Sequence, residues 1–356
     1  AQGEDLNARG AFVPEEKVSE RLRHFVEQAP KVALHIHLEG SLRRETAHEL
    51  ADRYKLELVE QQASCWKQFL ARWQGDCALL KAPEDFELLV EQLGEDLARD
   101  QIVYAEVHFS PEPHTRHQGF SFDQLFEALE SGRRKVEQSS GVRLRWIADG
   151  VRDSSTGLQC CRRTVDWMCS LADRGGLVGL GLGGDERTRP PELFTMLFRQ
   201  AKEAGFHTVA HAGEAINNVA DTLKALPVER IGHGVQAWND AETLKLLQRR
   251  QVALELCPTS NFVLGNAESW VPFKELLRSG VLLCINSDDP AILGCTLSGE
   301  LFNLGKHLER PFESVCRLLP NAIWASFAPD KEKQRYRLLL DHYIKETLPE
   351  EISLHS

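Results

Sequence analysis

The run KVALHIH at residues 31–37 opens a series of eight short apolar segments that are bounded by turn-forming residues and are typical of buried β-strands. The other seven lie at 102–109, 144–151, 177–183, 207–211, 229–234, 252–257 and 281–287. Segments with helical periodicity fall between them, at 43–56, 84–99, 121–138, 157–173, 191–204, 217–226, 240–250 and 271–278. Strand and helix therefore alternate along the chain.

This alternation predicts an α/β fold, a parallel (β/α)8 TIM barrel, because nearly continuous apolar strands suit a sheet that is buried on both faces. A doubly wound open sheet is the alternative. We expect one domain over residues 1–356, with an insertion at 57–82 and C-terminal helices at 297–356. The insertion carries Trp66, Phe69, Leu70 and Trp73, so it is expected either to cover a pocket as a lid or to pack on the barrel wall.

Composition narrows the choice of partners. The formal net charge of -11 favours a small neutral or cationic molecule and argues against nucleic acid. We expect no membrane segment and no export signal, because apolar runs are short and the first ten residues are polar. Nine cysteines without a C-x-x-C pair argue against disulfides and a thiolate zinc site, and favour a cytoplasmic protein. The sequence leaves the oligomeric state open.

Histidines and carboxylates follow several of the expected strands. His35 and His37 share one side of the first strand, because strand side chains alternate. His211 and Glu214 follow the fifth strand, and His233 lies in the sixth between two glycines, which we expect to leave room for a ligand or metal. The eighth strand ends at Asp288 and Asp289.

In a barrel these strand ends meet at one rim, where active sites lie. Imidazoles with one carboxylate suit zinc or another divalent ion, and a catalytic metal keeps one position open for water. His108 ends the second strand, and it is expected either to line the pocket or to have a structural role.

Six short motifs resemble the adenosine deaminases of the metal-dependent amidohydrolase superfamily. They are HIHLEGS at 35–41, GDE at 184–186, HAGE at 211–214, GHG at 232–234, CPTSN at 257–261 and NSDDP at 286–290. The resemblance implies one zinc ion per chain, held by His35, His37, His211 and Asp288. It also implies that Glu214, His233 and Asp289 act on water and base, and that the Gly184 backbone contacts the purine.

These implied roles agree with simple chemistry. Zinc acidifies water, and His233, expected near its ordinary pKa, takes the water proton. Glu214, if kept protonated in an apolar and carboxylate-rich site, donates a proton to the purine ring. Asp289 either orients the water or accepts a hydrogen bond from the purine, and the sequence does not separate these two roles.

The expected activity is hydrolytic deamination of a 6-aminopurine nucleoside such as adenosine. Glu39 stands where the family's adenosine enzymes usually have Asp, at a position associated with the ribose, so aminodeoxyfutalosine and free adenine remain alternatives. A metal-dependent amidase or phosphoesterase is a second hypothesis. The alternative from a different class is a catalytically silent binding protein of the same fold.

Overall fold

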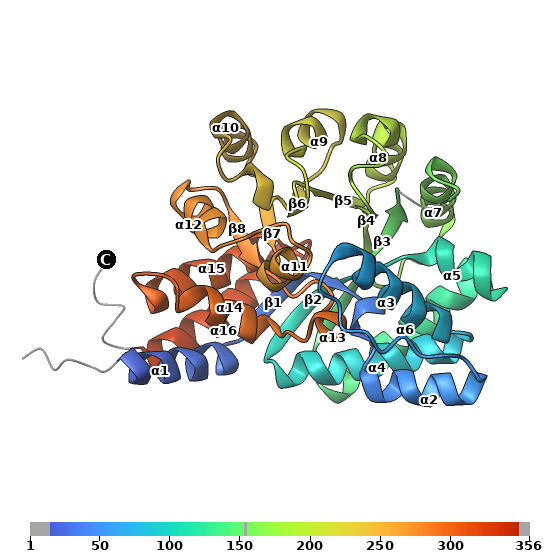
Figure 1. Cartoon of the computed structure of the whole chain (residues 1–356), viewed down its shortest axis with the longest axis horizontal. Helices are drawn as coiled ribbons and strands as arrows, with labels where there is room; N and C mark the ends of the chain where they lie inside the picture. The colour runs from blue at the N-terminus through green and yellow to red at the C-terminus, as the bar shows by residue number, and fades with distance from the viewer. Residues whose placement is uncertain (1–14, 153–154, 349–356) are drawn as a thin grey trace, which may run out of the picture.

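The computed structural model describes residues 15–152 and 155–348, which form a barrel of eight parallel strands surrounded by helices (Figure 1). The strands are β1 (Lys31–His37), β2 (Ile102–Phe109), β3 (Arg143–Val151), β4 (Leu177–Gly183), β5 (His207–Ala212), β6 (Arg230–His233), β7 (Ala253–Leu256) and β8 (Leu283–Ile285). Each strand pairs in parallel with the next one in the chain, in the order β1 to β8. This order confirms the (β/α)8 barrel and excludes the doubly wound sheet, in which the strand order reverses.

The two ends of the sheet meet where β8 approaches β1. Asp288 forms a parallel bridge with Ile36, and its backbone N–H donates to the His35 carbonyl at 3.0 Å. Asn286 adds a side-chain link, because its Oδ1 accepts from the N–H groups of Leu34 (2.8 Å) and His35 (3.0 Å). β8 is shorter than predicted because residues 286–288 leave the regular ladder to make this junction.

Helices lie at all the segments where the apolar periodicity predicts them. Before the fifth strand they are α1 (Glu15–Gln28), α2 (Arg44–Tyr54), α3 (Trp66–Leu79), α4 (Pro83–Arg99), α5 (Pro111–Gln118), α6 (Phe122–Ser139), α7 (Leu158–Ser170) and α8 (Thr195–Glu203). After it they are α9 (Val219–Ala225), α10 (Ala241–Arg250), α11 (Pro258–Val263), α12 (Val271–Arg278), α13 (Pro290–Leu293), α14 (Leu297–Gly305), α15 (Pro311–Ala325) and α16 (Asp330–Thr347). Short 3-10 helices are η1 (Glu39–Ser41), η2 (Pro191–Phe194) and η3 (Val235–Ala237). The predicted helix at 191–204 thus divides into η2 and α8, and α1, α5, α11 and α13 are additional helices that the sequence did not predict.

The insertion after β1 lies across the barrel mouth. Its helix α3 begins at Trp66 and appears in Figure 1 beside α11 and α13, which follow β7 and β8. Phe69 joins Leu264, Ile292 and Leu293 in a small hydrophobic cluster, separate from the main core, with Trp66 and Trp73 packed against it. The aromatic residues therefore bury their surface against loops of the rim and not against the outer barrel wall.

Inside the barrel, below the rim, a buried ionic network fills the space between strands. The Arg230 guanidinium donates to Glu106 on β2 and to Glu255 on β7, and all three side chains are essentially inaccessible to solvent. Burying these charges is tolerated because each one is paired. Glu255 connects this network to the rim through His35.

No helix in the described part of the chain combines the length and the apolar character that a membrane span requires.

Candidate metal and catalytic site

His35, His37, His211 and Asp288 bring three imidazole nitrogens and one carboxylate to the barrel mouth. Asp288 Oδ1 lies 3.3 Å from His35 Nε2 and 3.2 Å from His37 Nε2. His211 Nε2 lies 3.2 Å from His37 Nε2. Donor atoms about 2.0–2.1 Å from a tetrahedral ion are separated by about 3.3 Å. Three of the six separations among these donors match that spacing.

The hydrogen bonds of these histidines direct their free nitrogens to the same point. His35 Nδ1 faces Glu255 Oε2 at 2.7 Å, and His211 Nδ1 faces the Leu182 carbonyl at 3.0 Å. A proton on each Nδ1 leaves the Nε2 lone pair available for a cation. His35 Nε2 is fully buried and has no hydrogen-bond partner among the described residues. A buried lone pair of this kind is costly unless a ligand satisfies it, so the residues present fit a divalent metal ion.

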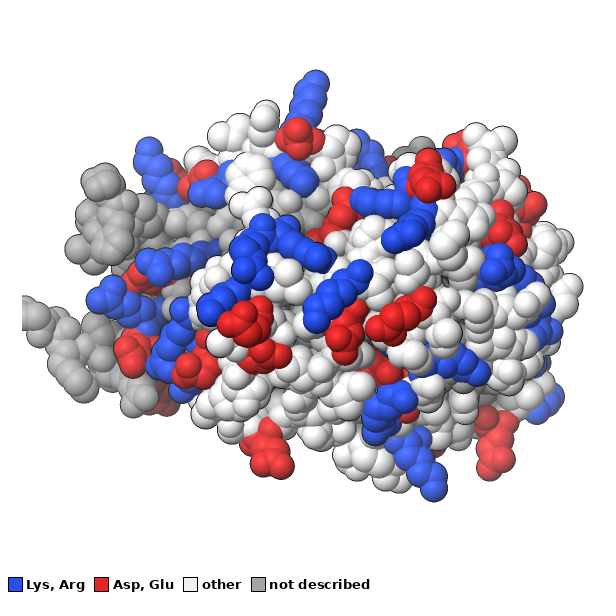
Figure 2. Space-filling model, turned by 90° about the horizontal axis from the view of Figure 1, so that it is seen from above, with Lys and Arg blue, Asp and Glu red and all other residues white. Residues whose placement is uncertain are grey.

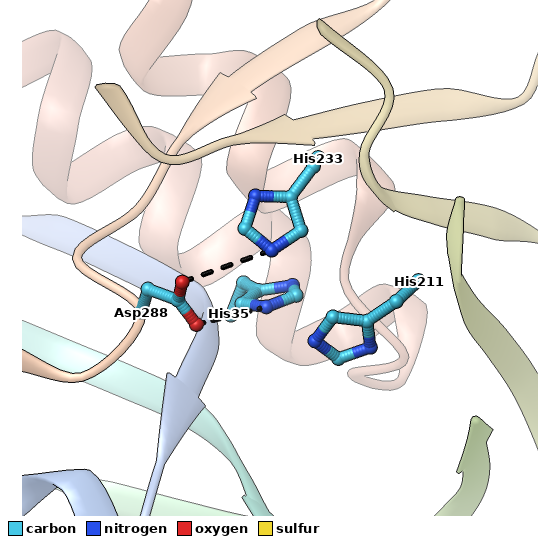
Figure 3. A group of neighbouring side chains, drawn as sticks. All are labelled: His35, His211, His233 and Asp288. Carbon is cyan, nitrogen blue, oxygen red and sulfur yellow. Dashed lines mark ion pairs between the residues drawn. The ribbon is translucent and has the colours of Figure 1, made fainter. Parts of the chain in front are cut away.

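His233 lies close to the same group, as Figure 3 shows. The potential ligand atoms of His35, His211, His233 and Asp288 all lie within 4.8 Å of one another. His233 Nε2 is 3.7 Å from Asp288 Oδ2 and 3.8 Å from Glu214 Oε2. His37 Nε2 lies nearer to the Asp288 carboxylate, at 3.2 Å, than His233 Nε2 does, at 3.7 Å. His233 is positioned between two carboxylates.

The backbone is strained at two of these residues. His233 has φ 64° and Asp288 has φ 63°, in the left-handed region that L-residues other than glycine seldom adopt. Such strain is commonly stored at functional sites, where the surrounding structure holds the residue in place. Hydrogen bonds to neighbouring strands hold both residues. The backbone N–H of Asp288 donates to β1 and its carbonyl accepts from β1, and Gly234, the residue after His233, donates its N–H to the Ala212 carbonyl.

The glycines around His233 make room for protein side chains. A Cβ on Gly232 would lie 2.7 Å from Cε1 of His35, and one on Gly234 would lie 2.6 Å from Cδ2 of Leu254. The expectation that these glycines admit a ligand directly is therefore corrected. The absence of a side chain at Gly232 allows the His35 ring to pack against β6. Gly232 therefore affects the candidate metal site by giving the His35 ring its position.

Glu214 follows β5 and faces the cavity with its side chain 12% exposed. Burial, together with the negative charges of Asp288 and Glu186, raises the pKa of Glu214 to about 8. The carboxyl is therefore mainly protonated at neutral pH, as a proton donor must be. Glu186 also holds the backbone beyond Glu214, since its Oε1 accepts from the N–H groups of Ala215 (2.6 Å) and Ile216 (2.8 Å).

His233 is neutral at physiological pH. Burial is the largest cause, and the neighbouring His35 and His37 add to it, so that the pKa of His233 is lowered to about 3. The expectation of an ordinary pKa was wrong, because the sequence does not show that the ring is buried among other histidines. His233 Nδ1 lies 3.3 Å from the side-chain amide of Asn261, in the CPTSN motif.

Asp289 lies beside the metal group and is fully enclosed. Burial and the negative charge of Asp288 raise the pKa of Asp289 well above its ordinary value. Its Oδ1 has no hydrogen-bond partner among the described residues. Gly40 provides the space for this carboxyl, because a Cβ there would lie 1.9 Å from Asp289 Oδ1. The potential ligand atoms of His37, Asp288 and Asp289 also lie within 4.8 Å of one another.

These groups open into a cavity of about 100 Å³ at the barrel mouth. Its wall is formed by His37, Trp66, Phe69, Leu70, Trp73, Ser110, Asp149, Val151, Gly183, Gly184, His211, Glu214, His233, Leu264, Asp288 and Asp289. The wall thus includes Gly184 and the four insertion residues noted in the sequence. Ser110, Asp149 and Val151 were missed, although their places at the ends of β2 and β3 could have suggested them.

Glu39 lies behind this wall. Its Oε1 accepts from the Ser110 N–H at 2.8 Å and faces His114 Nε2 at 2.9 Å. The side chain is 1% exposed and does not line the cavity. A direct contact between Glu39 and substrate stays a prediction, and in this structure Glu39 supports Ser110.

A closed (β/α)8 barrel with histidines and carboxylates at its carboxyl-terminal mouth defines an amidohydrolase-type enzyme. The family model for adenosine deaminase matches residues 30–343, and the chain belongs to that family. It is therefore a deaminase, a hydrolase that acts on C–N bonds.

Two relatives are each 32% identical to this chain. The aminodeoxyfutalosine deaminase of Streptomyces avermitilis matches 96% of this chain and 98% of its own length. The adenine deaminase of Vibrio parahaemolyticus matches 90% and 97%. The crystal structure of the adenine deaminase from Arthrobacter aurescens superposes with a TM-score of 0.82 at 30% identity, covering 89% of this chain and 99% of that one. A Burkholderia ambifaria amidohydrolase with bound zinc has a TM-score of 0.81 at 23% identity, covering 92% and 95%.

Proposed function

We propose that this enzyme removes the exocyclic amine of a 6-aminopurine nucleoside such as adenosine by hydrolysis, with one zinc ion held by His35, His37, His211 and Asp288. The observation that carries the proposal is the meeting of these four residues at the barrel mouth, beside a cavity that Glu214 also lines. A bound zinc ion would supply the Lewis acidity that makes water nucleophilic at neutral pH. The zinc-bound structure of similar fold supports this choice over other divalent ions.

The side chains of the cavity have the protonation states that the reaction needs. Neutral His233 takes the proton of the attacking water, and its Nε2 lies 3.7 Å from Asp288 Oδ2 and 3.8 Å from Glu214 Oε2. Protonated Glu214 donates to the purine ring as the carbon that carries the amine becomes tetrahedral. Asp289 lies close enough to Asp288 to orient the water, or to accept a hydrogen bond from the purine, and the Gly184 backbone supports the base. His233 then passes its proton to the amine, the C–N bond breaks and ammonia leaves, while the hydroxyl group on the tetrahedral carbon returns a proton to Glu214 as the carbonyl forms.

The cavity favours an uncharged aminopurine over a nucleotide. Its described wall contains no Lys or Arg that would pair with a phosphate, and the chain carries a net charge of -11. Lys and Arg are interspersed with Asp and Glu on the face shown in Figure 2, which also gives no support to a nucleic-acid partner. The aromatic side chains of α3 offer an apolar cover for a flat base.

The candidate substrates all belong to one chemical class, the 6-aminopurines. Adenosine is the first, and the relatives at 32% identity support free adenine and aminodeoxyfutalosine as alternatives. A silent binding protein is disfavoured, because every position of the predicted catalytic set is filled. We also propose a reducing, cytoplasmic location, because the cysteines are scattered along the sequence and form no C-x-x-C pair.

The test is to incubate the zinc-loaded enzyme with adenosine, deoxyadenosine, adenine and aminodeoxyfutalosine, and to measure absorbance change and ammonia release. We expect ammonia in one-to-one ratio with the converted purine, and a release at least about 100-fold slower from Glu214→Gln. A phosphoesterase would release no ammonia. Failure of the zinc-loaded enzyme to convert any aminopurine would refute the proposal.

A further inference from the structure

A buried pair, His108 on β2 and Asp149 on β3, lies directly behind His37. His108 is opposite His37 in the register of β1 and β2, and their ring centroids are 5.1 Å apart. His108 Nδ1 faces Asp149 Oδ1 at 2.9 Å, and the other oxygen, Oδ2, lies 3.6 Å from His37 Nδ1. Asp149 therefore stands between two imidazoles, with one oxygen for each.

The barrel is built to admit this carboxylate. Gly181 on β4 is paired with Asp149, and a Cβ at Gly181 would lie 1.8 Å from Asp149 Oδ1. Any larger residue at 181 would displace the carboxylate or the strand. Both His108 and Asp149 are at most 1% exposed, so the contact between His108 Nδ1 and Asp149 Oδ1 satisfies two buried polar atoms, while His108 Nε2 has no hydrogen-bond partner among the described residues.

His35 and His211, the other two histidines of the candidate metal site, each have an acceptor facing Nδ1. For His35 it is the carboxylate of Glu255, and for His211 it is the Leu182 carbonyl. In the described chain no other contact to an acceptor is found at His37 Nδ1. At 3.6 Å the Asp149 contact is an ion-pair contact, longer than a hydrogen bond. It nevertheless favours the tautomer with the proton on Nδ1, because a carboxylate attracts an N–H group and repels a lone pair.

We propose that Asp149, held in place by His108, is the positioning residue of His37. It keeps the proton of His37 on Nδ1, so that the Nε2 lone pair faces Asp288 and His211. His108 acts through Asp149, because its hydrogen bond fixes the direction of the carboxylate. This inference rests on the metal site of the proposed function, but not on the identity of the substrate.

The first test is Asp149→Asn, with zinc affinity measured by chelator competition. The amide offers one acceptor and one donor. If its oxygen stays with His108, its NH₂ group faces His37 Nδ1 and favours the tautomer that cannot bind metal through Nε2. We expect the zinc dissociation constant to rise about 10- to 100-fold, as is usual when an outer partner of a metal-bound histidine is lost. Asp166→Asn, at an exposed site on α7, is the matched control and should leave the affinity unchanged.

The second test uses His108, in case the Asp149 variant does not fold. His108→Asn retains a donor for Asp149 and should change zinc affinity less than threefold, whereas His108→Leu removes the donor and should weaken it about tenfold. The double variant His108→Leu/Asp149→Asn should bind zinc no more weakly than Asp149→Asn alone. Nitrogen-15 NMR of histidine-labelled enzyme should show the His37 proton on Nδ1 in the wild type and a loss of that preference in Asp149→Asn.

Three results would overturn the inference. They are wild-type zinc affinity in a folded Asp149→Asn variant, additive losses in the double variant, or a raised KM with zinc affinity unchanged, which would make Asp149 a substrate contact. The zinc-affinity and NMR readouts do not depend on aminopurine conversion, and only the KM comparison does. Failure of the substrate panel therefore remains distinguishable from failure of this inference.

Discussion

The protonation of Glu214 leads to the sharpest prediction, an alkaline limit to activity. The pKa of Glu214 is raised from an ordinary 4.5 to about 8, so the carboxyl is roughly nine-tenths protonated at pH 7. A carboxyl with the ordinary pKa would be protonated in only about 0.3% of molecules at that pH. The site therefore increases the proton-donating form by roughly 300-fold, which corresponds to about 3 kcal/mol at pH 7.

The direction of the pH dependence follows from which protonation form of Glu214 is active. Protonated Glu214 is the active form, so kcat/KM should be constant below about pH 7 and should fall tenfold per pH unit above about pH 8. Glu186→Gln removes one of the negative charges that raise this pKa while keeping the oxygen that bonds to the loop, so the fall should begin at lower pH. Glu203→Gln, at an exposed site at the end of α8, should leave the profile unchanged.

The assay is the initial rate of aminopurine loss from pH 5 to 10 at saturating zinc. Glu214→Gln should keep its zinc content and lose about 10²–10⁴-fold in kcat, the usual contribution of a general acid. A wild-type rate that keeps rising to pH 10 would refute the assigned proton donor. Wild-type turnover by the Gln variant would do the same.

Three further predictions concern the metal, the junction of the barrel and the lid. Zinc at 100 times its dissociation constant should stabilise the fold by about 3 kcal/mol, seen as a higher melting temperature, and His35→Ala should abolish this difference. Asn286→Ala should lower the free energy of unfolding by about 1–3 kcal/mol in denaturant titration, because two backbone N–H groups of β1 lose their acceptor. Asn217→Ala, at an exposed site, is the control. An equal loss of stability in the control would contradict this explanation. Trp66→Ala should raise KM about tenfold with little change in kcat if α3 covers the substrate. Trp324→Ala, at a site 48% exposed on α15, should not change KM.

Local pattern was sufficient to predict the barrel and the chemistry of its mouth. Strand side chains alternate with a period of two, so H-x-H in an apolar run places both imidazoles on one side. In a parallel barrel every strand ends at the same rim, so residues as distant as His35 and Asp288 are expected to meet. The structure confirms the fold, and it brings the predicted metal ligands to within 3.2–3.3 Å of their nearest neighbours in the set.

Other properties depend on which side chains share a buried space, and only the tertiary structure shows that. The low pKa of His233 comes from enclosure among histidines, and the high pKa of Glu214 comes from burial near Asp288 and Glu186. Where the insertion packs depended on the loops after β7 and β8, because Phe69 of α3 is buried against Leu264, Ile292 and Leu293. Asp149 can lie beside His37 only because Gly181, on another strand, leaves space for its carboxylate. These three residues are far apart in the sequence, so no short motif contains them. Sequence periodicity determines the direction of each side chain, whereas electrostatics depend on distances between strands that are far apart in the chain.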